Sequence, residues 1–147
     1  MIYDIKGTLT WALRERLKTD SIYQMEIGTA TWYLDNYTAR AVPTACAYVK
    51  LETAPEGITR KLTRRVIEYQ ETLLTDTGTR KNNEKHLVCV FRAEDGTEVG
   101  VRDDHAKLLG KTGRLYGVQD GTADGLLVVR GSDGTPGAIF PPVRIPT

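Results

Sequence analysis

The sequence lacks the features that usually mark an enzyme or a membrane protein. It contains two cysteines and two histidines among 147 residues, and no nucleophile elbow, His-Glu-x-x-His or Cys-x-x-Cys motif. Its longest apolar runs, such as residues 126–129, are far shorter than the roughly 20 residues of a membrane-spanning helix. We therefore expect no membrane partner, no bound metal and no cofactor.

The few cysteines give no sign of an oxidising compartment. Cys46 and Cys89 each lie in an apolar alternating run, which is typical of a small buried side chain. Residues 1–6 contain no basic stretch followed by an apolar core, so we expect no secretory signal. The expected location is the cytoplasm, or the host cytoplasm or virion if the source is viral.

An excess of one charge is also missing. The chain has 20 basic and 19 acidic residues and a formal net charge of +1, which gives no general attraction to a polyanion. Nucleic-acid binding would therefore need a local basic patch. With 40% hydrophobic and 27% charged residues, the composition is that of a folded globular domain.

The first 51 residues combine helix and strand patterns. Leu9, Leu13 and Leu17 recur at four-residue spacing and predict a helix over residues 8–19 with these leucines on one apolar face. Two strands follow, one predicted by β-branched and aromatic residues over 25–37 and one by alternation over 45–51, the latter starting after Pro43.

A second helix is predicted after residues 53–56, which have the spacing of a capping box. An apolar stripe then runs from Ile58 to Leu73 at helical spacing. A strand over residues 65–74 is the alternative. Residues 75–86 contain almost no apolar side chain and predict a solvated loop.

Beyond residue 86, short alternating runs predict antiparallel strands separated by turns, among them Glu94-Asp95-Gly96 and Ser132-Asp133-Gly134. One helical turn is expected over residues 103–109, ending at Gly110. Short strands in so small a segment favour a closed barrel, which removes unpaired edges. The chain would then divide into an α+β half over 1–78, a polar linker over 79–86 and a β-barrel over 87–147.

The segment from Gly110 to Val118 resembles the glycine-spaced strand opening of SH3-like and KOW-type barrels. The resemblance implies a barrel that binds RNA, DNA or protein. It would make Lys111, Arg114 and Tyr116 the natural contacts.

The main basic concentration lies in the second predicted helix. Arg60, Lys61, Arg64 and Arg65 would share one side of it, opposite the apolar stripe, and could follow a phosphate backbone. A solvated side with local ion pairs to Glu68 and Glu71 is the alternative.

Aromatic side chains are the candidates for a protein contact. Trp32 and Tyr33 are adjacent, so in a strand they point to opposite faces and cannot both enter one core. Trp32, Tyr33 and Tyr37 are therefore candidate partner-binding residues, with burial as the alternative.

Asp103, Asp104 and His105, with His86, could supply metal ligands or an acid–base pair. Consecutive residues cannot all point at one ion, and a solvated helix cap is the alternative. A small metal-dependent hydrolase built on Asp104 and His105 therefore stays a third hypothesis.

The sequence predicts an α+β protein in which a two-helix, small-sheet half precedes an SH3-like barrel. The predicted function is a non-enzymatic binding or assembly protein, a homo-oligomeric component of a viral particle or another large complex. The main alternative is a nucleic-acid-binding module that uses the predicted basic helix and the barrel.

Overall fold

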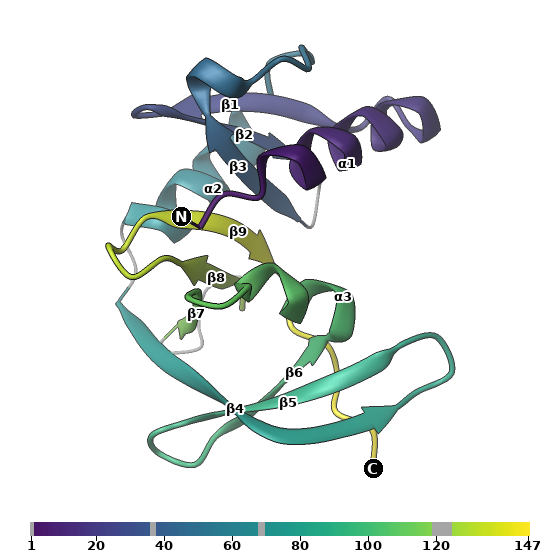
Figure 1. Ribbon diagram of the computed structural model, residues 1–147, viewed down its shortest axis with the longest axis vertical. Helices are drawn as coiled ribbons and strands as arrows, with labels where there is room; N and C mark the ends of the chain where they lie inside the picture. The colour runs from purple at the N-terminus through teal and green to yellow at the C-terminus, as the bar shows by residue number, and fades with distance from the viewer. Residues whose placement is uncertain (1, 36–37, 68–69, 119–124) are drawn as a thin grey trace.

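The computed structural model describes residues 2–35, 38–67, 70–118 and 125–147. These residues form three α-helices, two short 3-10 helices and nine strands of one antiparallel sheet (Figure 1). The strand order is β1-β2-β3-β9-β8-β7-β4-β5-β6. No helix in the described part of the chain combines the length and apolar character needed to cross a membrane.

The helices are α1 (Ile5–Lys18), α2 (Glu56–Ile67) and α3 (Asp103–Ala106), with the 3-10 helices η1 (Thr44–Cys46) and η2 (Lys107–Leu109). The strands are β1 (Tyr23–Ile27), β2 (Ala30–Leu34), β3 (Ala39–Pro43), β4 (Glu71–Asn82), β5 (Leu87–Ala93), β6 (Glu98–Arg102), β7 (Arg114–Val118), β8 (Leu127–Arg130) and β9 (Pro136–Phe140).

The first three strands form a meander whose two faces are both covered. β1 and β2 are joined by a tight turn at Gly28, whose φ of 60° suits glycine. This turn splits the strand predicted over residues 25–37 into two. The strand predicted over 45–51 is wrong, because the chain leaves the sheet at Pro43 and enters η1.

Helices α1 and α2 lie on opposite faces of this meander (Figure 1). The α1 core contains Trp11, Tyr33 and Val42, whereas the α2 core contains Trp32 and Leu62. Since successive strand residues alternate between faces, one strand supplies both cores.

Helix α2 ends at Ile67, so the helix predicted to continue to Leu73 is too long. β4 begins at Glu71 and runs to Asn82, which contradicts the loop predicted over residues 75–86 except at residues 83–86, where the chain turns into β5. Backbone pairing with β5 holds this polar stretch in the sheet, with an irregular register between Asp76 and Arg80. The division of the chain at residues 79–86 stays a prediction.

The predicted closed barrel is wrong, because the sheet is open. β9 pairs with β3, so the edge that a barrel would need for closure is already occupied. Pro141 and Pro142 follow β9 and cannot donate to a ladder. The C-terminal segment reaches the edge strand β6 through the Gly100–Val143 bridge, with 2.9 Å from the Val143 nitrogen to the Gly100 oxygen. For the same reason the first half has no separate small sheet.

The later strands curve around a third core that includes Phe91, Leu115 and Phe140. Tight turns at Gly96 and Gly134 have positive φ and confirm the predicted hairpin positions. The helical turn predicted over residues 103–109 is also confirmed, as α3 and η2. The predicted turns at Asp120-Gly121 and Asp124-Gly125 involve residues outside the described part of the chain.

Candidate interaction surface

The aromatic candidates from the sequence lie inside the molecule. Trp32 is 1% exposed under α2, and Tyr33 has no exposed surface under α1. The Tyr33 hydroxyl donates to the Val49 carbonyl at 2.7 Å. The two rings do face opposite sides, but each side has its own core, so neither is exposed for a partner. Tyr37 lies outside the described residues.

Arg65 is also buried, which contradicts its predicted place on an exposed basic side. Its guanidinium donates to Glu71 Oε1 at 2.9 Å, to the Leu126 carbonyl at 2.6 Å and to the Tyr116 carbonyl at 3.2 Å. Arg130 binds both Glu71 carboxylate oxygens, at 2.7 and 3.0 Å. This group joins α2 to β4, β7 and β8.

The remaining basic residues of α2 are exposed. Arg60 pairs with Glu56 at 2.7 Å, one helical turn away. Lys61 and Arg64 are exposed and also take part in interactions. The exposed basic side of α2 is therefore reduced to Arg60, Lys61 and Arg64.

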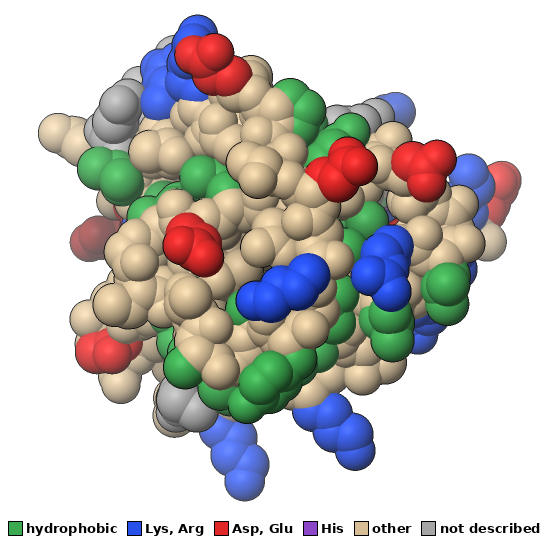
Figure 2. Space-filling model, turned by 90° about the horizontal axis from the view of Figure 1, so that it is seen from above, with side chains coloured by type: hydrophobic (Ala, Val, Ile, Leu, Met, Phe, Trp, Pro, Cys, Tyr) green, Lys and Arg blue, Asp and Glu red, His purple; other side chains and the backbone are tan. Residues whose placement is uncertain are grey.

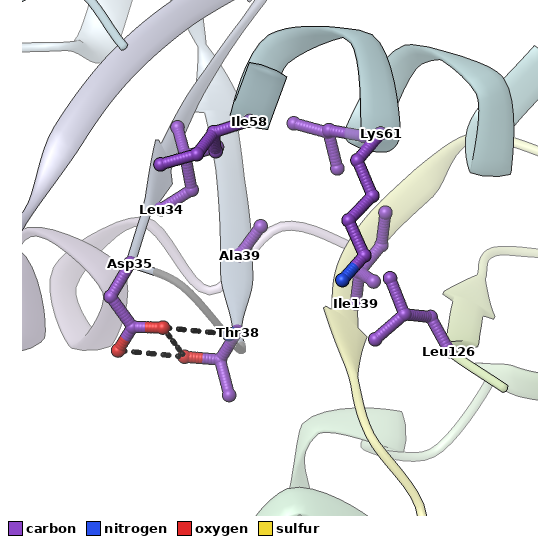
Figure 3. Close-up of a pocket in the computed structure, with 9 residues that line it drawn as sticks. Leu34, Asp35, Thr38, Ala39, Ile58, Lys61, Leu126 and Ile139 are labelled. Atoms are coloured by element: carbon purple, nitrogen blue, oxygen red, sulfur yellow. Dashed lines mark hydrogen bonds between the residues drawn. The ribbon is translucent and has the colours of Figure 1, made fainter. Parts of the chain in front are cut away.

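Lys61 borders a small cleft between α2 and the sheet (Figure 3). Its side chain extends from α2 across the cleft toward Leu126 and Ile139. On the other side, the Thr38 backbone nitrogen donates to Asp35 at 2.7 Å. The cleft has a volume of about 30 Å³, which is enough for a water molecule but not for a substrate.

The contacts implied by the barrel resemblance lie on a different part of the molecule from the exposed side of α2. Lys111 is exposed in the turn after η2, and Arg114 begins β7 opposite Arg130 of β8. Tyr116 is half-buried in β7. The bond from Arg65 to the Tyr116 backbone carbonyl connects this set to the α2 residues.

The Asp103, Asp104 and His105 side chains have different partners. Asp103 pairs with Lys107 at 3.3 Å, and Asp104 pairs with Arg102 at 3.1 Å. His86 lies in the β4–β5 turn, 3.0 Å from Asn83. Within residues 2–35, 38–67, 70–118 and 125–147, no three His, Cys, Asp or Glu side chains form a group that could hold a metal ion.

His105 is a buried side chain of α3. Its ring stacks on Phe140 with 4.7 Å between centroids, and its Nδ1 has no hydrogen-bond partner among the described residues. Burial lowers the pKa of His105 to about 4. The ring is therefore neutral near pH 7, and with so low a pKa it is a weak base for taking a proton from a substrate.

Helix α1 has an exposed apolar surface at Leu13 and Leu17, which the sequence placed on the apolar face of the helix. The buried residues of α1 are Thr8, Trp11 and Ala12, whereas Leu13 is 43% exposed and Leu17 is 80% exposed. The signal in the sequence was the series Ile5, Thr8, Leu9 and Ala12, which follows the i, i+3, i+4, i+7 spacing of a helix face. That series leaves Leu13 and Leu17 outside the core.

Basic side chains flank these two leucines. Arg14 and Lys18 are exposed and lie on the same outward side of α1 by helical spacing. Neither makes an ion pair with any residue that the structure describes. We call Leu13, Arg14, Leu17 and Lys18 the α1 outer face.

Figure 2 looks down on the end of the molecule that carries α1 and β1. Hydrophobic side chains reach the surface there among basic and acidic ones. An apolar patch with a polar rim is typical of an interaction site.

No protein-family model, curated protein or solved structure matches this chain. A function is therefore inferred from its residues and their geometry.

Proposed function

We propose that the protein is a non-enzymatic assembly protein that forms homo-oligomers through the α1 outer face. The observation that carries the proposal is the exposure of Leu13 and Leu17, one helical turn apart, at 43% and 80%. The proposal includes a role in a viral particle or another large complex. It places the protein in the cytoplasm, or in the host cytoplasm or virion.

Apolar burial supplies the driving force for such a contact. Transfer of a leucine side chain from water into an interface contributes about 1.5–3 kcal/mol. Two leucines on adjacent turns form a compact anchor, which is the usual way in which an amphipathic helix binds a groove. Arg14 and Lys18 would form the charged rim that selects and orients the partner.

The nucleic-acid alternative has less support. Arg65 is buried, and Arg60 is paired with Glu56. The hydrolase alternative has less support as well, since His105 is buried and its pKa is lowered to about 4 by that burial.

Sedimentation velocity at several micromolar concentrations tests the proposal. The wild-type chain is expected to form oligomers, and the variant Leu13→Ser/Leu17→Ser is expected to raise the dissociation constant at least tenfold. Asn82→Ser is the matched control, because it places serine at an exposed position at the end of β4. A wild-type chain that sediments only as a monomer would overturn the proposal, as would equal association of the wild type and the double-serine variant.

A further inference from the structure

A hollow of about 510 Å³ lies along β4 and the end of β5. Leu73, which is 44% exposed, supplies its apolar lining together with Ala93. This volume lies within the roughly 300–1,000 Å³ of typical ligand pockets, so it can hold a pair of leucine side chains.

The charge around the hollow is mainly negative. Asp76 and Arg92 line the hollow, and each has a partner of opposite charge. Asp76 pairs with Arg80 at 2.8 Å, and Arg92 pairs with Glu98 at 2.7 Å. Glu94 also lines the hollow, and it makes no ion pair within the described ranges of the chain.

Asp95 follows Glu94 in the same turn. Its carboxylate accepts a hydrogen bond from the Thr97 backbone nitrogen at 2.9 Å, which lowers its pKa and keeps it ionised. Asp95 borders the adjacent hollow with Leu74 and Val99, whereas the lining of the β4–β5 hollow carries two carboxylates, Asp76 and Glu94, and one guanidinium, Arg92. The α1 outer face has the opposite charge, since its ionisable residues are Arg14 and Lys18.

We infer that the α1 outer face of one copy docks into the β4–β5 hollow of the next copy, so that the protein assembles head to tail. This inference rests on the proposed function and names the partner surface. Leu13 and Leu17 would cover Leu73, and Arg14 and Lys18 would approach Glu94. Both the apolar contact and the charge pairing then favour the same arrangement.

A two-fold contact between α1 helices is less favourable. It would place Arg14 and Lys18 of one copy against those of the other, and like charges across an interface cost free energy. Docking into the hollow replaces this repulsion with attraction.

The positions of the two surfaces allow a chain of copies. α1 and the β4–β5 ribbon lie toward opposite ends of the longest axis of the molecule (Figure 1). One copy can therefore use both surfaces at the same time. Contacts between two different surfaces produce a ring when the rotation closes and a filament when it does not.

Complementation between two blocked variants tests the arrangement. Leu13→Ser/Leu17→Ser removes the apolar anchor and leaves the hollow intact, whereas Glu94→Lys reverses the charge at the hollow and leaves α1 intact. Glu84→Lys makes the same charge change in the exposed β4–β5 turn and is the matched control. Sedimentation velocity is measured for each chain alone and for an equimolar mixture of the two blocked variants.

Each blocked variant alone is expected to sediment as a monomer, and Glu84→Lys is expected to assemble like the wild type. The mixture is expected to form a species of twice the monomer mass, because one intact face and one intact hollow remain. This recovery also shows that both variants are folded.

Two results would overturn the head-to-tail arrangement. In the first, Glu94→Lys assembles as strongly as the wild type while Leu13→Ser/Leu17→Ser is monomeric. That result would leave the proposed function in place. The other is a mixture that stays monomeric although both variants keep the wild-type circular-dichroism spectrum. A monomeric wild type would instead remove the proposed function itself.

Discussion

Arg65 and Glu71 form an ion pair inside the molecule, with 2.9 Å between Arg65 Nη1 and Glu71 Oε1 and no exposed surface on the Arg65 side chain. Arg130 binds the same carboxylate from β8. Arg130 also donates to the Val66 carbonyl at 3.0 Å, at the end of α2. Buried charges are stable only when they are well paired and hydrogen-bonded, and here several carbonyls complete the set. The group holds the end of α2 on the sheet.

Removal of the Glu71 charge should therefore be strongly destabilising. We expect Glu71→Gln to lower the free energy of unfolding by about 3–5 kcal/mol, because it removes the carboxylate charge that pairs with the buried Arg65 guanidinium. Glu56→Gln breaks the exposed pair with Arg60 and should cost less than about 1 kcal/mol. Urea denaturation of the two variants measures the difference. Equal losses would contradict a stabilising role for the buried group.

His105 should make the fold sensitive to acid. Burial lowers the pKa of the folded-state ring to about 4, from an ordinary value of 6.5. Between these values the unfolded chain binds a proton that the folded chain does not, so stability falls as the pH drops from 6.5 toward 4. The slope from this group is at most about 1.4 kcal/mol per pH unit.

The variant His105→Phe tests this origin, because phenylalanine can keep the stacking on Phe140 and cannot titrate. We expect urea denaturation between pH 7 and pH 4.5 to show a flatter profile for His105→Phe than for the wild type. His86→Gln, which changes the other histidine and leaves His105 in place, is the control. An unchanged slope in His105→Phe would assign the acid sensitivity to other groups.

The contact between β6 and the C-terminal segment depends on the absence of a side chain at Gly100. A Cβ atom there would meet the Val143 carbonyl oxygen in a severe clash. We expect Gly100→Ala to lower the free energy of unfolding by about 1–3 kcal/mol, as overpacking does elsewhere. Gly57→Ala in α2 meets no atom within 4 Å and should be neutral or stabilising by up to about 1 kcal/mol. Thermal denaturation that ranks the two variants in the reverse order would contradict the tight contact.

Local signals predicted much of the secondary structure. Gly96 and Gly134 lie in hairpin turns because glycine adopts positive φ without a steric cost. Each follows an aspartate, and this Asp-Gly pair can be recognised in the sequence. Thr53 of the predicted capping box does not begin α2, since it bridges to Gln24 and the helix begins at Glu56, but the short helix before Gly110 follows from an equally local pattern. Such features depend on neighbouring residues alone.

The arrangement of the sheet depends on residues far apart in the chain, which alternation cannot identify. β3 pairs with β9, and this contact between the two halves prevents the predicted barrel from closing. Alternation specifies the faces of β9 but not the strand beside it. A closed barrel and an open sheet therefore have the same local pattern.

The candidate site was missed for a similar reason. Leu13 and Leu17 fit a helical stripe as well as Thr8 and Ala12 do. Which of the two stripes is buried depends on how Trp11 packs on the sheet. Arg65 looked exposed because the carbonyls that it binds, those of Leu126 and Tyr116, come from parts of the chain far along the sequence. Charge alone could not distinguish a buried, paired arginine from a solvated one.

The molecular mass of the wild-type chain as a function of concentration tests the central claim most directly. Mass photometry at nanomolar and light scattering at micromolar concentrations cover the range of a reversible association. Assembly through the α1 outer face predicts multiples of the chain mass whose population grows with concentration. A single species of one chain mass across the whole range would contradict it.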